Sequence, residues 1–180
     1  WYQKAAKKSF APAQNNLGLI LAGNNYSAPD FSEAVRWFRK AADSGYGPAQ
    51  WNLARHLELG RGVDQDLPES VEWVKKAAEQ DIPAAQNRLG VCYSDGIGME
   101  ADEVKAVGWF RKAAEQNLPA GRCNLGIRLR DGRGTGSEPK LALELLQQAA
   151  EEGVMVAQFA MAQMAATDEE GEPNETEATQ

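Results

Sequence analysis

Apolar residues recur along this chain at the spacing of one helix face, in two patterns that alternate. In the first pattern a leucine, or a methionine in the last copy, follows a small residue by four positions, as Leu53 follows Ala49. Further apolar residues such as Leu57 extend the stripe to i+8, and such a stripe is typical of an α-helix. The first pattern therefore predicts helices over 13–23, 49–59, 85–95, 121–131 and 157–165.

The second pattern has the stripe Ala34, Trp37, Phe38 and Ala41 and predicts a helix over 31–45, with copies over 67–80 and 103–116. Its most regular part is the hexapeptide WFRKAA, which occurs at 37–42 and again at 109–114. Related hexapeptides at 1–6, 73–78 and 145–150 read WYQKAA, WVKKAA and LLQQAA, so the interval is 36 residues. The paired alanines have little bulk, so we expect a neighbouring helix to approach them closely.

A 36-residue repeat that holds two helices predicts a solenoid. One short helix pair cannot bury its apolar face alone, and stacking on the next pair completes the core. We therefore expect an all-α superhelix of stacked antiparallel helix pairs over residues 1–166, followed by a tail at 167–180. The predicted units are a half-repeat at 1–10, repeats at 11–46, 47–82, 83–118 and 119–154, and a terminal helix at 155–166.

Charge is distributed unevenly along the chain. The formal charge is -7, but the stretch 168–180, DEEGEPNETEATQ, holds six carboxylates and no Lys or Arg. Without it, 19 basic and 20 acidic residues remain, which argues against a nucleic-acid-binding protein. We expect the polar tail to be disordered. No segment reaches the roughly 18 apolar residues of a membrane helix, and the start at Trp1 indicates an excerpt or a processed form.

These segments resemble the Sel-one-like repeats, a branch of the tetratricopeptide-repeat superfamily. The resemblance rests on A-Q-x-N-L-G in the first helix, the G-x-G loop and W-F-x-K-A-A in the second helix, over about residues 1–166. The sequence departs from this pattern where Ala54 replaces glycine, where GNN replaces the first G-x-G, and where LLQQAA lacks Trp. The resemblance implies a right-handed α-solenoid in which the first helix of each repeat lines the concave face.

The resemblance implies three functions. The first, which we expect, is a non-catalytic scaffold that binds a peptide or protein in the concave groove, as an adaptor or assembly factor. The second is an immunity protein that blocks the active site of a secreted toxic effector, and the third is a penicillin-binding or penicillin-hydrolysing enzyme. The bacterial periplasm or cell envelope is the compartment that the resemblance favours, with the cytoplasm as the other. Partner identity and oligomeric state stay open, and we expect no cofactor and no metal.

Glycine-rich loops follow the predicted first helices, starting at Gly23, Gly60, Gly96 and Gly132. The last of them, DGRGTG at 131–136, invites a phosphate-binding interpretation. A phosphate loop, however, follows a strand and opens a helix, whereas these glycines follow a helix. We interpret them as turns that end the helix with positive φ.

Other candidate reactive residues are few. His56 is the only histidine, and Cys92 and Cys123 fall at different repeat positions, so neither a zinc site nor a Cys–His pair is indicated. We interpret His56 as a partly packed helix residue and the cysteines as free, half-buried thiols. Asp64 and Asp66 lie in an inter-helix loop, where they are expected to start a helix or remain solvated.

Four of the five tryptophans, namely Trp1, Trp37, Trp73 and Trp109, hold the same position in the second helix. Identical placement predicts a packing role, so Trp37, Trp73 and Trp109 are predicted to be structural, as are Gly60, Gly96 and Gly132. Trp51 is out of phase, and its equivalents are Asn15, Asn87, Cys123 and Phe159. A position that varies while its neighbours repeat is not dictated by stacking. Trp51 is therefore a candidate for binding, and the alternative is packing at the edge of the groove.

Positions near Trp51 make up the predicted concave face. An aromatic residue beside Arg and Asn is typical of a binding hot spot. A row of asparagines could hold an extended peptide backbone or could instead satisfy neighbouring groups of the repeat. The predicted partner-binding residues are Asn15, Asn16, Leu19, Trp51, Asn52, Arg55, Glu58, Asn87, Arg88, Val91, Ser94, Asn124, Ile127, Arg130, Phe159 and Gln163.

Overall fold

The computed structural model describes residues 9–23 and 28–171, with side chains up to residue 166. The described part consists of helices and connecting loops, without strands. The helices are α2 (Ala11–Gly23), α3 (Phe31–Asp43), α4 (Gly47–Leu59), α5 (Leu67–Ala78), α6 (Pro83–Asp95), α7 (Glu103–Glu115), α8 (Pro119–Asp131), α9 (Pro139–Glu151) and α10 (Met155–Gly171). The predicted all-α solenoid with a 36-residue repeat is confirmed.

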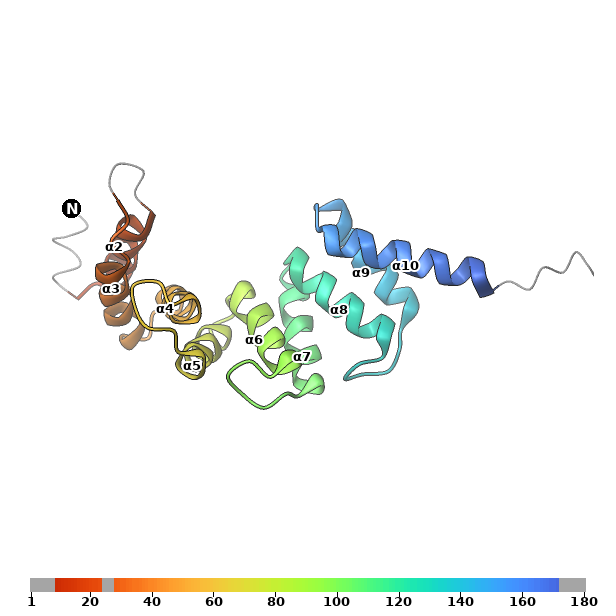
Figure 1. Ribbon diagram of the computed structural model, residues 1–180, viewed down its shortest axis with the longest axis horizontal. Coiled ribbons are helices and arrows are strands. Elements are labelled where there is room, and N and C mark those ends of the chain that lie inside the picture. Colours follow the sequence, from red (N-terminus) through yellow and green to blue (C-terminus); the bar gives the residue numbers. More distant parts are fainter. Residues whose placement is uncertain (1–8, 24–27, 172–180) are drawn as a thin grey trace, which may run out of the picture.

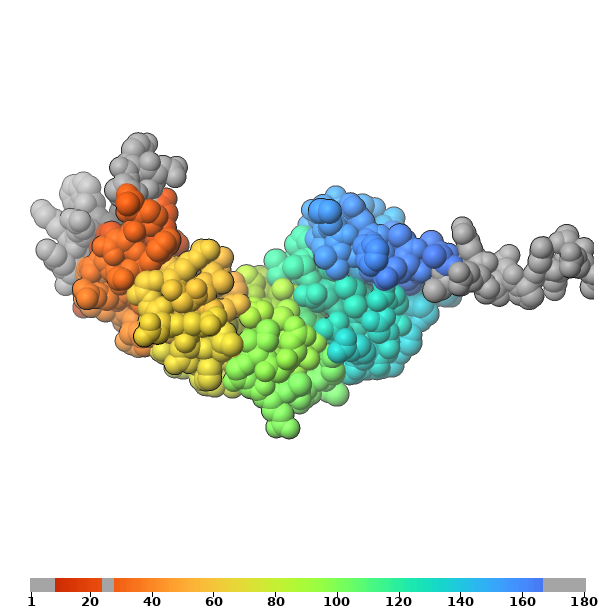
Figure 2. Space-filling view, viewed as in Figure 1, coloured from red at the N-terminus to blue at the C-terminus, as the bar shows by residue number. Residues whose placement is uncertain are grey.

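Successive helices pack against each other along a curved stack, which forms an arch in Figure 1. Across repeats, α2 also contacts α4, α6 contacts α8, and α8 contacts α10. These contacts place the first helix of each repeat on the shorter, inner side of the curve. Figure 2 shows that side hollowed between α4 and the C-terminal helices.

The helix ends differ slightly from those predicted. The first helices begin two residues earlier than predicted. In α4, α6 and α8 the first turn includes a proline, namely Pro48, Pro83 and Pro119, whose missing N–H is not needed there. Helix α10 continues to Gly171, five residues beyond the end predicted for the terminal helix. Residues 172–180, as well as Trp1 and most of the half-repeat 1–10, lie outside the described residues.

Aspartates begin the second helices. Asp30, Asp66 and Asp102 each accept a hydrogen bond from the backbone N–H three residues later, at 2.9, 2.8 and 3.0 Å. This is the N-cap arrangement that satisfies an otherwise unpaired donor at a helix start. The interpretation of Asp66 as a helix start is therefore confirmed, whereas Asp64 is exposed in the loop.

Glycines end the first helices, with one exception. Gly60, Gly96 and Gly132 are C-caps with φ of 62°, 68° and 65°, as predicted for left-handed helix ends. Gly23 is instead the last residue of α2, and positive φ is not among its features. The prediction was wrong there because the 36-residue equivalent of Gly60 is position 24, which lies outside the described residues.

A glycine in the first helix allows a large side chain of the second helix to pack against its backbone. A Cβ added at Gly18 or Gly90 would lie 2.5 or 2.6 Å from the ring of Phe38 or Phe110. In the second repeat the residue in phase with these phenylalanines is Val74, which is smaller. The departure at Ala54 from the glycine pattern is therefore matched by a smaller partner position, and both residues are buried in one cluster.

The phased tryptophans lie on the second helices. Trp73 is 8% exposed, and Trp37 and Trp109 are half-buried at the edges of their core clusters. A lysine one turn later lies over each ring, with Nζ 4.4, 3.9 and 4.1 Å from the centroids of Trp37, Trp73 and Trp109. This repeated cation–π contact covers the outer side of each indole.

Candidate functional site

The predicted binding residues lie on the inner helices with very different accessibility. Leu19, Arg55, Phe159 and Gln163 are exposed. Asn16, Trp51, Asn52, Glu58, Asn87, Arg88, Val91, Asn124, Ile127 and Arg130 are half-buried. Asn15 and Ser94 are buried, so the prediction that these two face a partner is wrong.

Asparagines on neighbouring inner helices bond to one another. The Asn52 side-chain amide donates to Asn15 Oδ1 at 2.9 Å, and that of Asn124 donates to Asn87 Oδ1 at 2.8 Å. Each pair joins two consecutive repeats, α2 to α4 and α6 to α8. The alternative interpretation of the asparagine row, satisfaction of a neighbouring group, therefore holds for these four residues. Asn15 is buried because it is covered in such a pair.

The junction between α4 and α6 lacks an asparagine pair, because Trp51 and Arg88 occupy the two positions. Arg88 bonds instead to Glu58 of α4, with Nη2 2.7 Å from Oε1 and Nε 3.2 Å from Oε2. A bidentate pair of this kind fixes the guanidinium in one orientation. The Arg88–Glu58 pair thus takes over the inter-repeat link and leaves the indole of Trp51 without an asparagine partner.

Trp51 combines packing with accessibility. It is half-buried and packs against the core cluster that α3, α4, α5 and α6 share. The guanidinium carbon of Arg55, one turn later on α4, lies 5.9 Å from the centroid of its ring. One side of the indole therefore serves the core, and the inner face carries an exposed arginine beside it.

Ser94 is buried because it belongs to an ion-pair network between α6, α7 and α8. Its hydroxyl accepts from Arg128 Nη2 at 2.5 Å and donates to Glu103 Oε1 at 3.4 Å. Arg128 Nε donates to Glu103 Oε2 at 3.2 Å, and Arg133 also donates to Glu103. The network fills the space between α6, α7 and α8.

A pocket of about 200 Å³ opens at the N-terminal end of the arch, between α2, α3 and α4. Its lining residues are Leu19, Ala22, Gly23, Phe31, Phe38, Asn52, Arg55, His56, Leu59 and Arg61. Leu19, Asn52 and Arg55 were predicted at the site, and the others were missed. Phe31 and His56 both lie at variable repeat positions, so the criterion that singled out Trp51 would also have found them.

His56 forms one wall of this pocket. Its ring lies 5.8 Å from that of Phe31 and 5.3 Å from that of Phe38, and Nδ1 donates to the Arg61 carbonyl at 2.8 Å. Burial lowers the pKa of His56 below its usual value. The hydrogen bond to the Arg61 carbonyl opposes this shift, and the charges of Arg61 and Arg55 add to it. His56 is therefore the partly packed helix residue that was predicted, held in its neutral form.

The described residues bring no group of three or more metal-binding side chains together. Cys92 and Cys123 are free and buried, deeper than the predicted half-burial, and desolvation raises the pKa of both thiols. A raised pKa suppresses the reactive thiolate. None of the helices in this part of the chain is long and apolar enough to cross a bilayer.

Comparison with protein families decides the relationship. The family model for the Sel1 repeat matches residues 1–10, 11–46, 47–82, 83–118 and 119–154. The chain belongs to the Sel1 repeat family. Repeats of this family mediate protein interactions, and its members are generally non-catalytic scaffolds. A comparison with curated proteins finds no significant match.

Solved structures of this family are similar over most of the chain. A protective antigen of uropathogenic Escherichia coli with an SLR fold is 37% identical, with a TM-score of 0.82, over 87% of this chain and 33% of that one. A Sel1 repeat protein from Oxalobacter formigenes is 30% identical, with a TM-score of 0.79, over 87% of this chain and 64% of that one. The chain thus spans about a third of the length of the first protein and less than two thirds of the length of the second. An immunity protein from Pseudomonas aeruginosa, 23% identical with a TM-score of 0.57 over 82% of this chain and 55% of that one, shares the fold.

Proposed function

We propose that this Sel1 repeat chain is a non-catalytic scaffold that holds a peptide or protein segment on its inner face, as a bacterial adaptor or assembly factor. The observation that carries this proposal is the environment of Trp51. Stacking does not require an indole there, since the equivalent positions hold Asn, Cys and Phe. The half-buried ring lies beside the exposed Arg55, and Trp and Arg dominate binding energies at protein interfaces.

The remaining accessible residues of the inner helices support an interface of mixed polarity. Leu19 is 47% and Phe159 is 66% exposed, while Val91 and Ile127 are half-buried between them along the arch. Arg130 is half-buried and donates to Asp131 and Gln163, so its charge is locally balanced. Such a surface favours apolar contacts supplemented by hydrogen bonds over capture by strong charge.

Two other functions were considered from the sequence. The similarity to an immunity protein is a similarity of fold, and no contact on the inner face speaks for an effector's active site in particular. An enzyme that works by nucleophilic catalysis would need an activated nucleophile. The two buried cysteines have raised pKa values, and the Nδ1 of His56 donates to a backbone carbonyl. A scaffold fits these features better.

Partner capture by the intact chain tests the proposal. The immobilised chain is incubated with an extract of the organism that encodes it, bound proteins are identified by mass spectrometry, and the affinity of the purified partner is measured. We expect Trp51→Ala to weaken binding by at least ~1 kcal/mol. Because one side of the indole packs against the core, the melting temperature should fall modestly while the chain stays folded.

Trp37→Ala is the matched control. Trp37 is also half-buried, with a cation at 4.4 Å from its ring, but it lies on an outer helix. We expect this variant to lose stability and to keep its affinity for the partner. Equal loss of affinity in the two variants, or unfolding of Trp51→Ala, would refute the assignment of Trp51 to the interface.

A further inference from the structure

Two repeats of this chain form a unit of 72 residues, and its two copies can be compared position by position. In the second copy, Arg128 lies with its guanidinium carbon 5.7 Å from the centroid of the Phe110 ring. Glu103 and Ser94 accept hydrogen bonds from it, and Arg133 pairs with the same glutamate. The Arg128 side chain is only 14% exposed. It fills the space between α6, α7 and α8.

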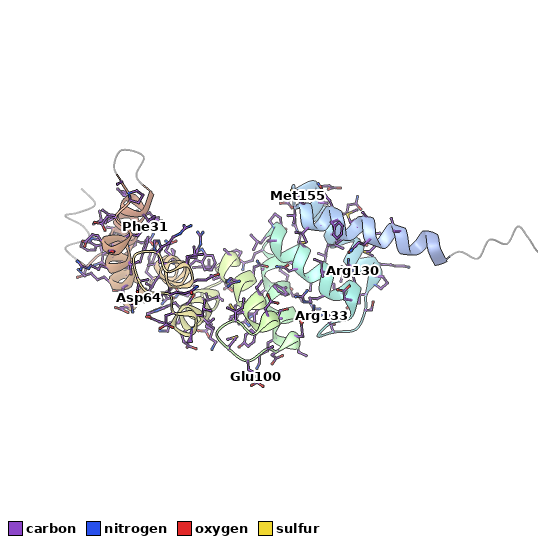
Figure 3. All side chains as sticks on the ribbon, viewed as in Figure 1. Phe31, Asp64, Glu100, Arg130, Arg133 and Met155 are labelled. Atoms are coloured by element: carbon purple, nitrogen blue, oxygen red, sulfur yellow. The ribbon has the colours of Figure 1, made fainter. Side chains whose placement is uncertain are left out.

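In the first copy the equivalent positions hold His56, Phe38, Phe31, Ala22 and Arg61. The first copy lacks both hydrogen-bond acceptors of the second copy, because Phe31 lies at the position of the glutamate and Ala22 at the position of the serine. The long arginine is replaced by the shorter histidine. These exchanges leave the pocket of about 200 Å³ where the second copy is filled by its own side chain. Figure 3 marks the two places by Phe31 near α3 and by Arg133 near α7 and α8.

The apolar part of the wall and the size of the pocket favour an apolar group. Phe31, Phe38 and Leu19 contribute apolar surface, and the His56 ring lies against the aromatic rings of Phe31 and Phe38. A cavity of about 150 Å³ lined by apolar side chains accepts a molecule of the size of benzene. The pocket is therefore large enough for one leucine or phenylalanine side chain.

The rim of the pocket carries positive charge. Arg55 and Arg61 both line it and are both exposed. Within the described residues neither has an ion-pair partner, whereas Arg133, the equivalent of Arg61, pairs with Glu103. Two unpaired guanidinium groups beside an apolar opening favour carboxylates next to the group that enters.

We propose that the pocket between α2, α3 and α4 binds one leucine or phenylalanine side chain of an acidic peptide segment, whose carboxylates pair with Arg55 and Arg61. The inference rests on the proposed scaffold function and names the chemistry of its partner. It also links the pocket to Trp51, because Arg55 lies between the two on α4. An extended acidic segment would contact the indole, the arginine and the pocket in turn.

The test uses an array of acetylated decapeptides with a central Leu, Phe, Ala or Lys. In the acidic set the flanking positions hold mixtures of Asp, Glu and Ser, and in the basic set they hold mixtures of Lys and Ser. Binding of the full chain is measured by fluorescence. We expect acidic peptides with Leu or Phe to bind at least tenfold more strongly than those with Ala or Lys, and than all basic peptides. Absence of this preference would overturn the inference.

The chain itself supplies the matched variant. The triple substitution Ala22→Ser, Phe31→Glu and His56→Arg installs the arrangement of the second copy in the first, with Arg61 already in place. It removes no net charge and reproduces a packing that this fold already contains. We expect a tenfold loss of binding to the acidic Leu and Phe peptides, with unchanged circular dichroism. Unchanged peptide binding by the folded triple variant would refute the pocket.

A second variant tests the proposal even if the triple variant does not fold. Arg55→Glu combined with Arg61→Glu changes only exposed side chains and should abolish the preference for acidic over basic flanks. If this preference persists, the rim assignment is wrong. Failure of the array, with partner capture still sensitive to Trp51→Ala, would refute the pocket and leave the scaffold function standing. Insensitivity of partner capture to Trp51→Ala, with a positive array, would refute the function proposed for the inner face instead.

Discussion

The second glycine of each G-x-G loop docks against the preceding repeat, and Gly98 is the one at the centre of the stack. Its φ is +66°, and a Cβ added to it would lie 2.8 Å from the carbonyl oxygen of Leu67 and 3.0 Å from Val71. Gly62 and Gly134 make the same approach to Phe31 and Glu103. Replacement of Gly98 by alanine therefore adds both backbone strain and an overlap with the first turn of α5.

Gly45→Ala separates the two effects. Gly45 has a φ of +83°, and an added Cβ would meet nothing within 4 Å. Left-handed backbone costs an alanine about 1–2 kcal/mol, and about 0.4–1 kcal/mol is recovered because the unfolded chain becomes less flexible. We expect Gly45→Ala to destabilise the protein by about 1 kcal/mol. Gly98→Ala adds an overpacking cost of about 1–3 kcal/mol, giving about 2–4 kcal/mol in total.

Urea unfolding followed by far-UV circular dichroism measures both variants against the unsubstituted chain. In a solenoid, stability is a sum over repeats and their interfaces, so a weakened central junction should also broaden the transition of Gly98→Ala. Equal destabilisation by the two substitutions would show that the loop does not dock through Gly98. The account of the second glycine as an inter-repeat contact would then be wrong.

Two further outcomes follow from the described contacts. Trp73→Ala should lower the free energy of unfolding by roughly 3–5 kcal/mol, because the indole is buried and its Nε1 donates to Glu69 at 3.1 Å; Trp109→Ala, half-buried, should cost less in the same urea titration. Burial lowers the pKa of His56 below 6.5, so just below that pH the unfolded state binds more protons and stability falls. His56→Gln removes this contribution. In parallel urea titrations, the unsubstituted chain should therefore lose more stability than the variant as the pH falls below 6.5. A pH-independent difference would contradict the assigned pKa direction.

The fold was predictable because stacking imposes the same requirement on every repeat. Helices α2, α4, α6 and α8 each bury a leucine such as Leu53 or Leu89. Helices α3, α5 and α7 each bury an alanine pair, so these residues recur in register. The errors lay at helix ends. The periodic pattern sets the buried face of a helix and does not fix its first or last residue.

The inner face was less predictable because its contacts join different repeat positions. Asn52 bonds to Asn15, which is 37 residues earlier, so aligning the repeats places the two partners in different columns. A comparison of columns then identifies which positions vary but not which of them bond to each other. Only the fold revealed that most of the asparagine row is occupied by its own neighbours and that Ser94 is buried in an ion-pair network.

Paired exchanges between repeats show how such contacts are maintained. Gln80 donates to Gln50 at 2.8 Å, and Gln116 donates to Gln86 at 2.8 Å. At the next junction the equivalent residues are an arginine and a glutamate, Arg122 and Glu152, which form an ion pair. Both members of the pair changed together while the link between repeats was retained.

The 36-residue period describes stacking, whereas the 72-residue period describes the inner surface. Asparagine pairs and the WFRKAA hexapeptide both recur at 72 residues, as expected if two repeats share one set of junction contacts. Some features of the inner surface break this longer period. Trp51, Phe31 and His56 break it, and all three lie at the α2–α4 end. The proposed binding chemistry therefore gathers where the chain departs from its own repetition, with Arg55 between the indole and the pocket.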